Sequence, residues 1–358
     1  MDTKILQQLK VWVLAPHVVT TDTSIDYYHD YSQSIAEYTK TFEALKIEWI
    51  WQPVYMNDFT KIIDAIADDE TAKQKVAFNL CDGDEINGAP GVSVIHYLEK
   101  KQIKYTGASA FFYDITTSKT PMKKAFDDAN VATAAWEVIT KANEIPQHIF
   151  EKVGTPILLK PAVSGGSMGV GVKNVVHNIE YLQTQVNTMF TGYGDWKLSV
   201  DGIVAEAFIT GPEFTVFIVG NYWDKANAIV YTPVERVFHK SLPKQEQFLS
   251  FDRLWELYEE EAAMPNNENF FEYQLPAEAL HVQIKELAWQ AFAACKGNSY
   301  TRVDLRMNET TNKLFVLEVN AQCGLSEDEN YTSIGAIIKA SNTTFADVVS
   351  QILLRTIN

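Results

Sequence analysis

Short apolar runs alternate with helix-patterned segments along the first third of this chain of 358 residues. The apolar runs predict buried strands, and the apolar spacing of residues 32–45 predicts a helix. Strands that alternate with helices form βαβ units, in which the strands lie parallel. The sequence therefore predicts an α/β lobe built on a mostly parallel sheet. Its strands are expected at residues 11–14, 47–51, 76–80 and 104–107.

The pattern changes near residue 118. A polar segment with helical spacing, residues 116–129, is followed by short apolar runs that turn-rich or helical stretches separate. We expect strands at residues 134–139, 157–160, 204–208, 214–219, 228–231, 302–307 and 314–319, and a helix at 276–295. The acidic, aromatic stretch 232–275 is expected to form an insertion or a lid. The predicted architecture is an α/β lobe followed by two α+β lobes, with domains at residues 1–118, 119–205 and 206–358.

The charge of the chain limits its partners. Thirty Lys and Arg residues face 46 Asp and Glu residues, which gives a formal net charge of −16. Nucleic acids and anionic membranes attract basic surfaces, so we expect neither as a partner. An anionic ligand would have to be met by a few local cations.

Cysteine usage and hydropathy favour a cytoplasmic protein. Cys81, Cys295 and Cys323 are an odd number of cysteines that lie far apart, which predicts neither a disulfide framework nor a zinc site. The first apolar run is short and has no signal-peptide cleavage pattern. No apolar stretch approaches the ~20 residues that span a bilayer. We therefore expect a cytoplasmic location.

A glycine-rich loop follows the apolar run that ends in Lys160. Residues 164–171 read SGGSMGVG. Glycine lets the backbone approach a ligand closely, and successive N–H groups can surround phosphate oxygens. The pattern is neither GxxxxGK[ST] nor GxGxxG before a helix, so it predicts neither a P-loop nor a Rossmann site. Two interpretations remain, a flexible hairpin and a phosphate cradle, and the adjacent lysine favours the cradle.

Two carboxylates and one amide in the last third suit a magnesium ion. Asp304 lies in RVDL, and Glu318 and Asn320 lie in LEVN. In extended strands Glu318 and Asn320 face the same side, and a hairpin would bring Asp304 beside them. Oxygen ligands of this kind suit Mg²⁺ that shares phosphate oxygens with a nucleotide. The alternative is that they are ordinary polar residues of an edge strand.

Arg302 precedes Asp304 by two residues, so both are expected on one face of the strand. A guanidinium beside such a site can neutralise charge that develops on a transferred group or on a tetrahedral oxyanion. The alternative is a structural salt bridge from Arg302 to Glu318.

The segment VAEAFITGPEFTVFIVG, residues 204–220, predicts two strands joined by a turn. Glu206 lies on the first strand, and Glu213 opens the second. A connection between lobes exposes backbone groups that can bind an adenine edge, and a carboxylate on the next strand can bind ribose hydroxyls. The alternative is a β-hairpin with solvated glutamates.

The order of these motifs resembles that of the ATP-grasp enzymes, and within them the D-alanine–D-alanine ligase-like carboxylate–amine ligases. KPAVSGGSMGVGV, EAFITGPEFTV, RVDL and LEVNAQCGL follow the family's order, and FNLCDG, IKYTGAS and TTSKTPMKKAF resemble its earlier segments. The resemblance extends from about residue 76 to the end. It implies an ATP-grasp fold with an N-terminal parallel-sheet (preATP-grasp) domain. It also implies an ATP-dependent ligase that forms an amide-type C–N bond between an amino acid and a carboxylate, or an equivalent acyl or keto acceptor. The reaction would pass through a phosphorylated intermediate and release ADP and phosphate.

The resemblance also implies roles for individual residues. The predicted ATP ligands are Lys119, Lys160, Gly165, Gly166, Ser167, Met168, Glu206, the backbone of Phe208 and Ile209, and Glu213 at the ribose. Two Mg²⁺ ions, which Mn²⁺ can replace, would be held by Asp304, Glu318 and Asn320. The predicted catalytic groups are Arg302, the backbone of Gly324 and Ser167. The implied partners are a small amino acid, a carboxylate substrate and a second copy of the chain in a homodimer.

The sequence departs from the family at the substrate end. Residues 15–32 lack the family's glycine-rich loop and the glutamate that engages the first amino acid's ammonium group. Asp82 follows Cys81 where the family has a His-Gly motif, and Cys323 replaces a usual proline. We therefore do not expect D-alanyl-D-alanine as the product.

Two further residues of the family, a substrate-binding serine and a phosphate-binding lysine, have no direct match in this sequence. Glu329 occupies the offset at which the family has a serine that binds the second substrate's carboxylate. Its own carboxylate would repel that group and could instead accept an ammonium or a hydroxyl group. Glu329 and the nearby Ser326 are the substrate candidates. The family's phosphate-binding lysine has no clear counterpart in residues 232–275, where Arg253 is the nearest cation. The alternatives to a ligase are a catalytically silent ATP-binding regulatory or scaffold protein, and a phosphotransferase that acts on a hydroxyl.

Overall fold

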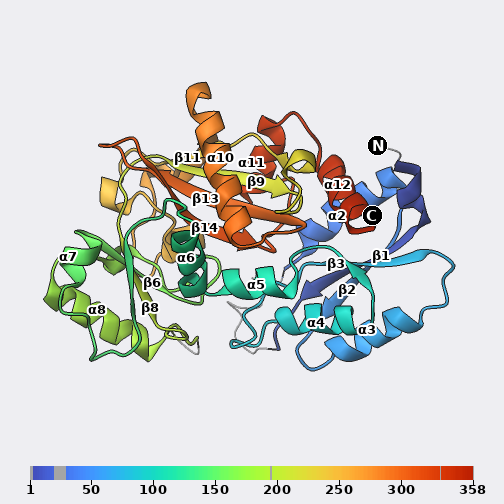
Figure 1. The fold of residues 1–358 in the computed structure, drawn as a ribbon, viewed down its shortest axis with the longest axis horizontal. Coiled ribbons are helices and arrows are strands. Elements are labelled where there is room, and N and C mark those ends of the chain that lie inside the picture. Colours follow the sequence, from blue (N-terminus) through green and yellow to red (C-terminus); the bar gives the residue numbers. More distant parts are fainter. Residues whose placement is uncertain (1–2, 20–29, 194–195, 331, 358) are drawn as a thin grey trace.

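The computed structural model describes residues 3–19, 30–193, 196–330 and 332–357, which form three sheets and the helices around them (Figure 1). The first sheet has the strand order β2-β1-β3-β4 and is parallel throughout. Its strands are β1 (Leu9–Pro16), β2 (Glu48–Val54), β3 (Gln74–Asn79) and β4 (Lys104–Tyr105). The helices of this region are η1 (Thr3–Gln8), α2 (Ser32–Leu45), α3 (Phe59–Asp68) and α4 (Val92–Lys100). The predicted α/β lobe is confirmed.

The second sheet, at the left of Figure 1, is antiparallel with the order β5-β8-β6-β7. Its strands are β5 (Trp136–Ile139), β6 (Ile157–Pro161), β7 (Val175–Val176) and β8 (Ile203–Ala207). The helical segments with it are α7 (Ile149–Val153), η2 (Val172–Asn174) and α8 (Ile179–Thr191). The boundary predicted between residues 205 and 206 falls inside β8, so we propose that this lobe ends after Ala207.

The third sheet is the largest, with the order β12-β11-β9-β13-β14 and β10 paired to β9. Its strands are β9 (Glu213–Val219), β10 (Ile229–Val230), β11 (Val234–Phe238), β12 (Phe271–Gln274), β13 (Tyr300–Met307) and β14 (Leu314–Ala321). The helices that follow β12 are α10 (Glu278–Ala294), α11 (Ser333–Ala340) and α12 (Phe345–Ile357). The stretch 232–275 therefore contributes two strands of this sheet. Its middle contains η4 (Lys244–Glu246), α9 (Phe251–Leu254) and η5 (Pro265–Asn267).

The single helix predicted at residues 116–129 is two helices, α5 (Ala110–Thr117) and α6 (Lys119–Asp128). Ser118 between them is extended and forms an isolated bridge with Val163. The backbone N–H of Lys119 donates to the carbonyl of Ala162 at 2.8 Å. This pairing interrupts the helix and places the first turn of α6 beside the glycine-rich loop.

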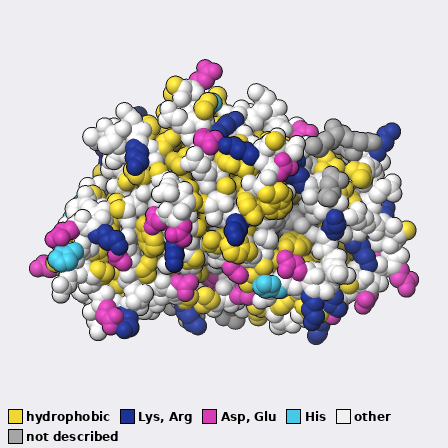
Figure 2. Space-filling model, viewed as in Figure 1, with side chains coloured by type: hydrophobic (Ala, Val, Ile, Leu, Met, Phe, Trp, Pro, Cys, Tyr) yellow, Lys and Arg dark blue, Asp and Glu magenta, His cyan; other side chains and the backbone are white. Residues whose placement is uncertain are grey.

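The first sheet shares one hydrophobic core with the C-terminal helices. Tyr38 of α2 packs edge-on against Phe78 of β3 and Phe345 of α12, with ring centroids 5.4 and 5.5 Å apart. Within the described ranges, no helix combines the length and apolar composition needed to cross a bilayer. Basic and acidic side chains are interspersed over the face of the molecule in Figure 2.

Candidate active site

The first turn of α6 carries a lysine that joins two of the predicted motifs. Lys119 Nζ donates to the carbonyl and the hydroxyl of Ser164, both at 3.3 Å, at the start of the glycine-rich loop. The same Nζ lies 4.0 Å from Oε2 of Glu318 on β14. The structure therefore brings the predicted phosphate cradle and the predicted metal ligands to one site.

Glu206 is the centre of a buried ion cluster. Its Oε1 accepts a hydrogen bond from Lys160 Nζ at 2.8 Å, and its Oε2 pairs with Lys123 Nζ. Burial alone would raise the pKa of the Glu206 carboxyl, but the two ammonium groups outweigh it and lower the pKa to about 2. Glu206 was expected to be an ATP ligand, but in this structure both of its oxygens pair with lysines.

Sequence reasoning missed Lys123. It lies one helical turn after Lys119, so both side chains project from one face of α6. Lys123 Nζ also donates to Thr133 Oγ1 at 2.6 Å, and the side chain is almost fully buried. The four-residue spacing of the two lysines was the available signal.

The β13–β14 hairpin aligns the predicted metal ligands as expected. Asp304 pairs with Glu318 and Arg302 pairs with Asn320 in the strand register, and a bulge follows Asp304. Arg302 Nε and Nη2 donate to the Asp304 carboxylate at 2.8 to 3.1 Å, and Asn320 Nδ2 donates to Asp304 Oδ2 at 3.0 Å. The partner of Arg302 is therefore Asp304 and not Glu318. Burial would raise the pKa of Asp304, but Arg302 and Arg236 outweigh it and lower the pKa.

These residues fit a hard divalent cation. Asp304 is buried, whereas the Glu318 side chain is 33% exposed, and the Lys119 ammonium group lies 4.0 Å from its carboxylate. Two carboxylates and an amide carbonyl on adjacent strands supply the oxygen donors that Mg²⁺ prefers.

Glu213 is engaged by two arginines. Its Oε1 pairs with Arg236 of β11, and its Oε2 accepts from Arg306 Nη2 at 2.9 Å. The carboxylate is buried, so it does not have the open position that was expected for a ribose-binding group.

Some backbone groups of the segment that connects the second and third sheets form hydrogen bonds within the protein. The Phe208 N–H donates to the Pro156 carbonyl at 3.0 Å, and the Ile209 carbonyl accepts from Arg306 Nη1 at 3.2 Å. The Phe208 ring is buried and packs edge-on against Phe248, with centroids 5.7 Å apart.

The glycine-rich loop is not a free hairpin. Gly166, Ser167 and Gly169 have φ values of +55°, +63° and +73°. Trp255 Nε1 donates to the Gly166 carbonyl at 2.9 Å, and the Phe251 N–H donates to the Val170 carbonyl at 2.8 Å. The middle of the 232–275 stretch therefore covers this loop.

The four loop residues predicted to bind ATP face different ways. The Met168 side chain is buried against Leu198 and Phe251, so only its backbone is available to a ligand. A Cβ placed on Gly165 would contact no atom within 4 Å, so this part of the loop faces open space.

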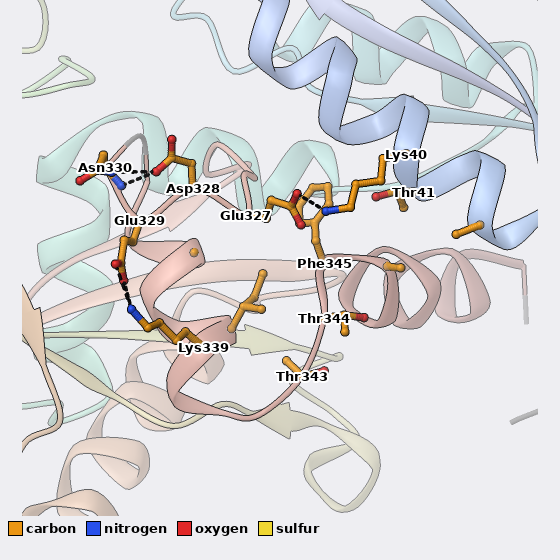
Figure 3. A pocket seen from close by; sticks show the side chains of 14 residues that line it. Lys40, Thr41, Glu327, Asp328, Glu329, Asn330, Lys339, Thr343, Thr344 and Phe345 are labelled. Atoms are coloured by element: carbon orange, nitrogen blue, oxygen red, sulfur yellow. Dashed lines mark hydrogen bonds and ion pairs between the residues drawn. The ribbon is translucent and has the colours of Figure 1, made fainter.

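The two substrate candidates are engaged by residues of α2 and α11. The Ser326 hydroxyl is fully buried and donates to Glu37 Oε1 of α2 at 2.7 Å. Glu329 pairs with Lys339 of α11 at 3.1 Å and lines a surface pocket of about 680 Å³ (Figure 3). In the same pocket Lys40 of α2 pairs with Glu327 at 2.7 Å.

A residue that lies beside Gly324 is instead Thr332, the N-cap of α11, which Ser333 follows as the first residue of the helix. A Cβ on Gly324 would lie 3.7 Å from the Thr332 methyl group. Both hydroxyls are buried and have no hydrogen-bond partner among the described residues. A fixed offset from Asn320 missed them because it assumed a loop of the family's length and path.

Asp82 follows β3 at the carboxyl end of the parallel sheet, the edge at which such sheets bind ligands. The Gly83 N–H donates to the Pro90 carbonyl at 2.9 Å, and the Tyr113 hydroxyl donates to the Gly83 carbonyl at 2.6 Å, which fixes the local backbone. The Asp82 side chain is exposed, yet the surrounding protein desolvates the carboxyl and raises its pKa to about 6. Among the described residues no cation offsets this.

This shift makes a pH-dependent prediction for stability. The folded-state pKa lies above the ordinary 3.8, so the favourable contribution of the protonated group is complete below pH 3.8 and is lost as the pH rises through 6. Asp82→Asn, which mimics the protonated group, should therefore be more stable than the wild type at pH 7.5 and equal to it at pH 4. Urea unfolding at both pH values measures the difference. Glu70→Gln, which removes an exposed charge before β3, is the control; a gain for Asp82→Asn that is the same at both pH values would contradict the prediction.

Two other sequence expectations concern this end of the site. Burial raises the pKa of the Cys323 thiol to about 12, which makes it a poor nucleophile.

Residues 20–29, most of the stretch that departs from the family, lie outside the described residues.

Comparisons with known proteins identify the fold and then the family. The D-alanine–D-alanine ligase from Bacillus anthracis complexed with ATP superposes with a TM-score of 0.65 at 17% identity, over 97% of each chain. The fold is that of the ATP-grasp enzymes, as predicted. A family model described as D-ala D-ala ligase C-terminus matches residues 126–354. The chain belongs to this family, which confirms the resemblance.

Relatives of the chain are distant. The D-alanine–D-alanine ligase of Chlorobium chlorochromatii is 26% identical over 263 residues, which are 72% of this chain and 64% of that protein. The uncharacterized protein y4sG of Sinorhizobium fredii is 26% identical over 260 residues, which are 72% of this chain and 68% of that protein.

Proposed function

We propose that the chain is an ATP-dependent ligase that forms an amide-type C–N bond between a carboxylate and an amino acid. One observation carries this proposal: Lys119 lies between Ser164 of the glycine-rich loop and Glu318 of the β13–β14 hairpin. A nucleotide phosphate held there would lie beside lysines, oxygen ligands for metal ions and an arginine. The membership of the ligase family supports the same reaction class.

Different residues are proposed to bind the phosphates, the adenine and the metal ions of the nucleotide site. Lys119, Lys160 and the backbone of Gly165, Gly166 and Ser167 bind phosphate oxygens, and Glu206 holds Lys160 in place. The backbone of Phe208 and Ile209 adjoins the adenine. Asp304, Glu318 and Asn320 would hold Mg²⁺, which would supply positive charge to neutralise the phosphates.

The reaction then has two steps. A carboxylate oxygen of the first substrate attacks the γ-phosphorus while the bond to ADP breaks, which gives an acyl phosphate. The lone pair of the amine attacks the acyl carbon, and the partly exposed Arg302 guanidinium and the Gly324 N–H stabilise the oxyanion. Collapse of this intermediate expels phosphate, and the amine proton passes to solvent. The loop and the segment that covers it exclude water from the acyl phosphate.

The substrate end supports an amino acid as one partner. The start of α11, with the unpaired hydroxyls of Thr332 and Ser333, suits a carboxylate near Gly324. Asp82 presents an uncompensated carboxylate at the adjoining sheet edge, which suits an ammonium group. These two groups replace Glu329 and Ser326 in the proposal.

Turnover with defined substrate pools tests the proposal. The protein is incubated with ATP, Mg²⁺ and pools of amino acids and carboxylates, and ADP release is followed before the product is identified by mass. We expect ADP release that requires a carboxylate and an amine, with an amide as product. ATP binding without turnover in any pool would favour the scaffold alternative, and a phosphorylated hydroxyl compound would favour the phosphotransferase.

A further inference from the structure

Two buried arginines share one carboxylate on the polar face of the third sheet. Arg236 of β11 and Arg306 of β13 are 4% and 3% exposed, and both bind Glu213 of β9, which is 5% exposed. In the strand register Glu213 pairs with Arg236 on one side and with Arg306 on the other. Alternation along the strands therefore places all three side chains on one face.

The other donors of the two guanidinium groups are only partly used. Arg236 Nη2 donates to the Tyr273 hydroxyl at 3.1 Å, and Arg306 donates to the carbonyls of Ile209 and Gln247. The Nε atoms of both arginines are buried and have no hydrogen-bond partner among the described residues. The two cations share one directly bound carboxylate, while Asp304 acts on Arg236 and Glu206 acts on Arg306 from farther away. The two unpaired N–H groups leave hydrogen-bond donors of this buried pair without an acceptor.

The two arginines lie between the adenine end and the metal end of the proposed nucleotide site. Arg306 contacts the carbonyl of Ile209, in the connection that adjoins the adenine. Asp304 of the metal site lies two residues before Arg306 on the same face of β13, about 7 Å along the strand. The ribose and phosphates of a nucleotide lie between these points.

We propose that Arg236 and Arg306 bind a phosphate oxyanion of the nucleotide, and that Glu213 orients the two guanidinium groups. This inference rests on the proposed function, and it replaces the ribose-binding role that was expected for Glu213. It also supplies the phosphate-binding cation for which residues 232–275 had shown no clear candidate.

Arg253, the nearest candidate from the sequence, has the opposite balance of charge. Its Nη2 donates to Glu246 at 2.6 Å, and its Nη1 lies 3.4 Å from Glu261, while Nε donates to the Ala262 carbonyl at 3.3 Å. One cation with two carboxylates has no excess positive charge for a phosphate. Arg253 instead holds the segment that covers the glycine-rich loop.

Binding of ATP and of adenosine to Arg236→Lys and Arg306→Lys tests the proposal by calorimetry on the full chain. Lysine keeps the buried charge but loses the planar pair of donors. We expect each variant to bind ATP about 10- to 100-fold more weakly than the wild type, which is the range for charge-assisted hydrogen bonds, and to bind adenosine as the wild type does. Arg355→Lys, in α12, is the control.

The outcomes separate this inference from the proposed function. A wild type that binds no ATP contradicts the proposed function itself. Wild-type ATP affinity in both variants, or equal losses for ATP and adenosine, overturns the phosphate assignment, since equal losses are the result of a purely structural role. A loss of ATP affinity that is confined to Arg253→Lys also overturns it.

Discussion

Replacement of Glu318 by Gln is expected to lower kcat by roughly 10²- to 10³-fold while leaving the fold intact. The substitution keeps the size of the side chain and removes one of the two metal-ligand charges beside Lys119. The side chain is 33% exposed and makes no close ion pair with any residue that the structure describes, so the free energy of unfolding should change by no more than about 0.5 kcal/mol. ADP release as a function of Mg²⁺ concentration, together with urea unfolding, measures both effects.

Glu309→Gln is the matched control for this experiment. Glu309 lies in the turn that joins β13 to β14, and its carboxylate pairs at 2.6 Å with Lys244 on the surface. The same chemical change at this position should leave kcat at the wild-type value. Wild-type turnover from Glu318→Gln, or an equal loss in both variants, would contradict the metal assignment.

Replacement of Glu206 by Gln should produce the largest loss of stability, about 3–5 kcal/mol. The change leaves the ammonium groups of Lys123 and Lys160 buried without their shared carboxylate. The pKa of Glu206 is lowered to about 2 from an ordinary value of 4.5, so its contribution is complete above pH 4.5 and is lost as the pH falls through 2. The stability difference between the wild type and the variant, measured by urea unfolding, should therefore shrink between pH 4.5 and 2.

Glu137→Gln on the neighbouring strand β5 is the control for burial. Glu137 pairs with the exposed Lys152, so the same substitution should lower the free energy of unfolding by less than about 1 kcal/mol. Equal losses for Glu137→Gln and Glu206→Gln would show that the Glu206 cluster has no special role in stability.

The features of the fold that depend on local sequence pattern could be predicted from the sequence. The alternation of apolar runs and helices predicted that the strands of the first sheet are parallel, because this pattern is formed by residues that follow one another in the chain. The period of two in RVDL and LEVN predicted that Asp304 lies beside Glu318 and Asn320, because a hairpin joins the two strands directly, and the strand register agrees.

The partners of buried charges could not be predicted in the same way. Glu206 meets Lys123, and Glu213 meets Arg236 and Arg306, only through the pairing of strands and helices that are distant in the chain. The sequence did not reveal that register. A buried carboxylate must be paired with a cation. Glu206 and Glu213 were expected to contact ATP directly, but in the structure they pair with lysines and arginines of the protein.

The path of a loop was also beyond the sequence. The offset from Asn320 predicted Glu329 as a substrate residue, but the loop after Gly324 packs Ser326 against α2 and turns Glu329 toward Lys339. The start of α11 then lies beside Gly324. Only the three-dimensional course of the chain distinguishes these arrangements.

The transfer of oxygen from the carboxylate substrate to phosphate tests the central claim most directly. Once the substrate pools have identified a carboxylate that supports turnover, it is labelled with ¹⁸O in both oxygens, and the released phosphate is analysed by mass. Formation of an acyl phosphate predicts one ¹⁸O atom in each phosphate, because the carboxylate oxygen that attacks phosphorus leaves with it. Unlabelled phosphate alongside a formed amide would contradict the mechanism.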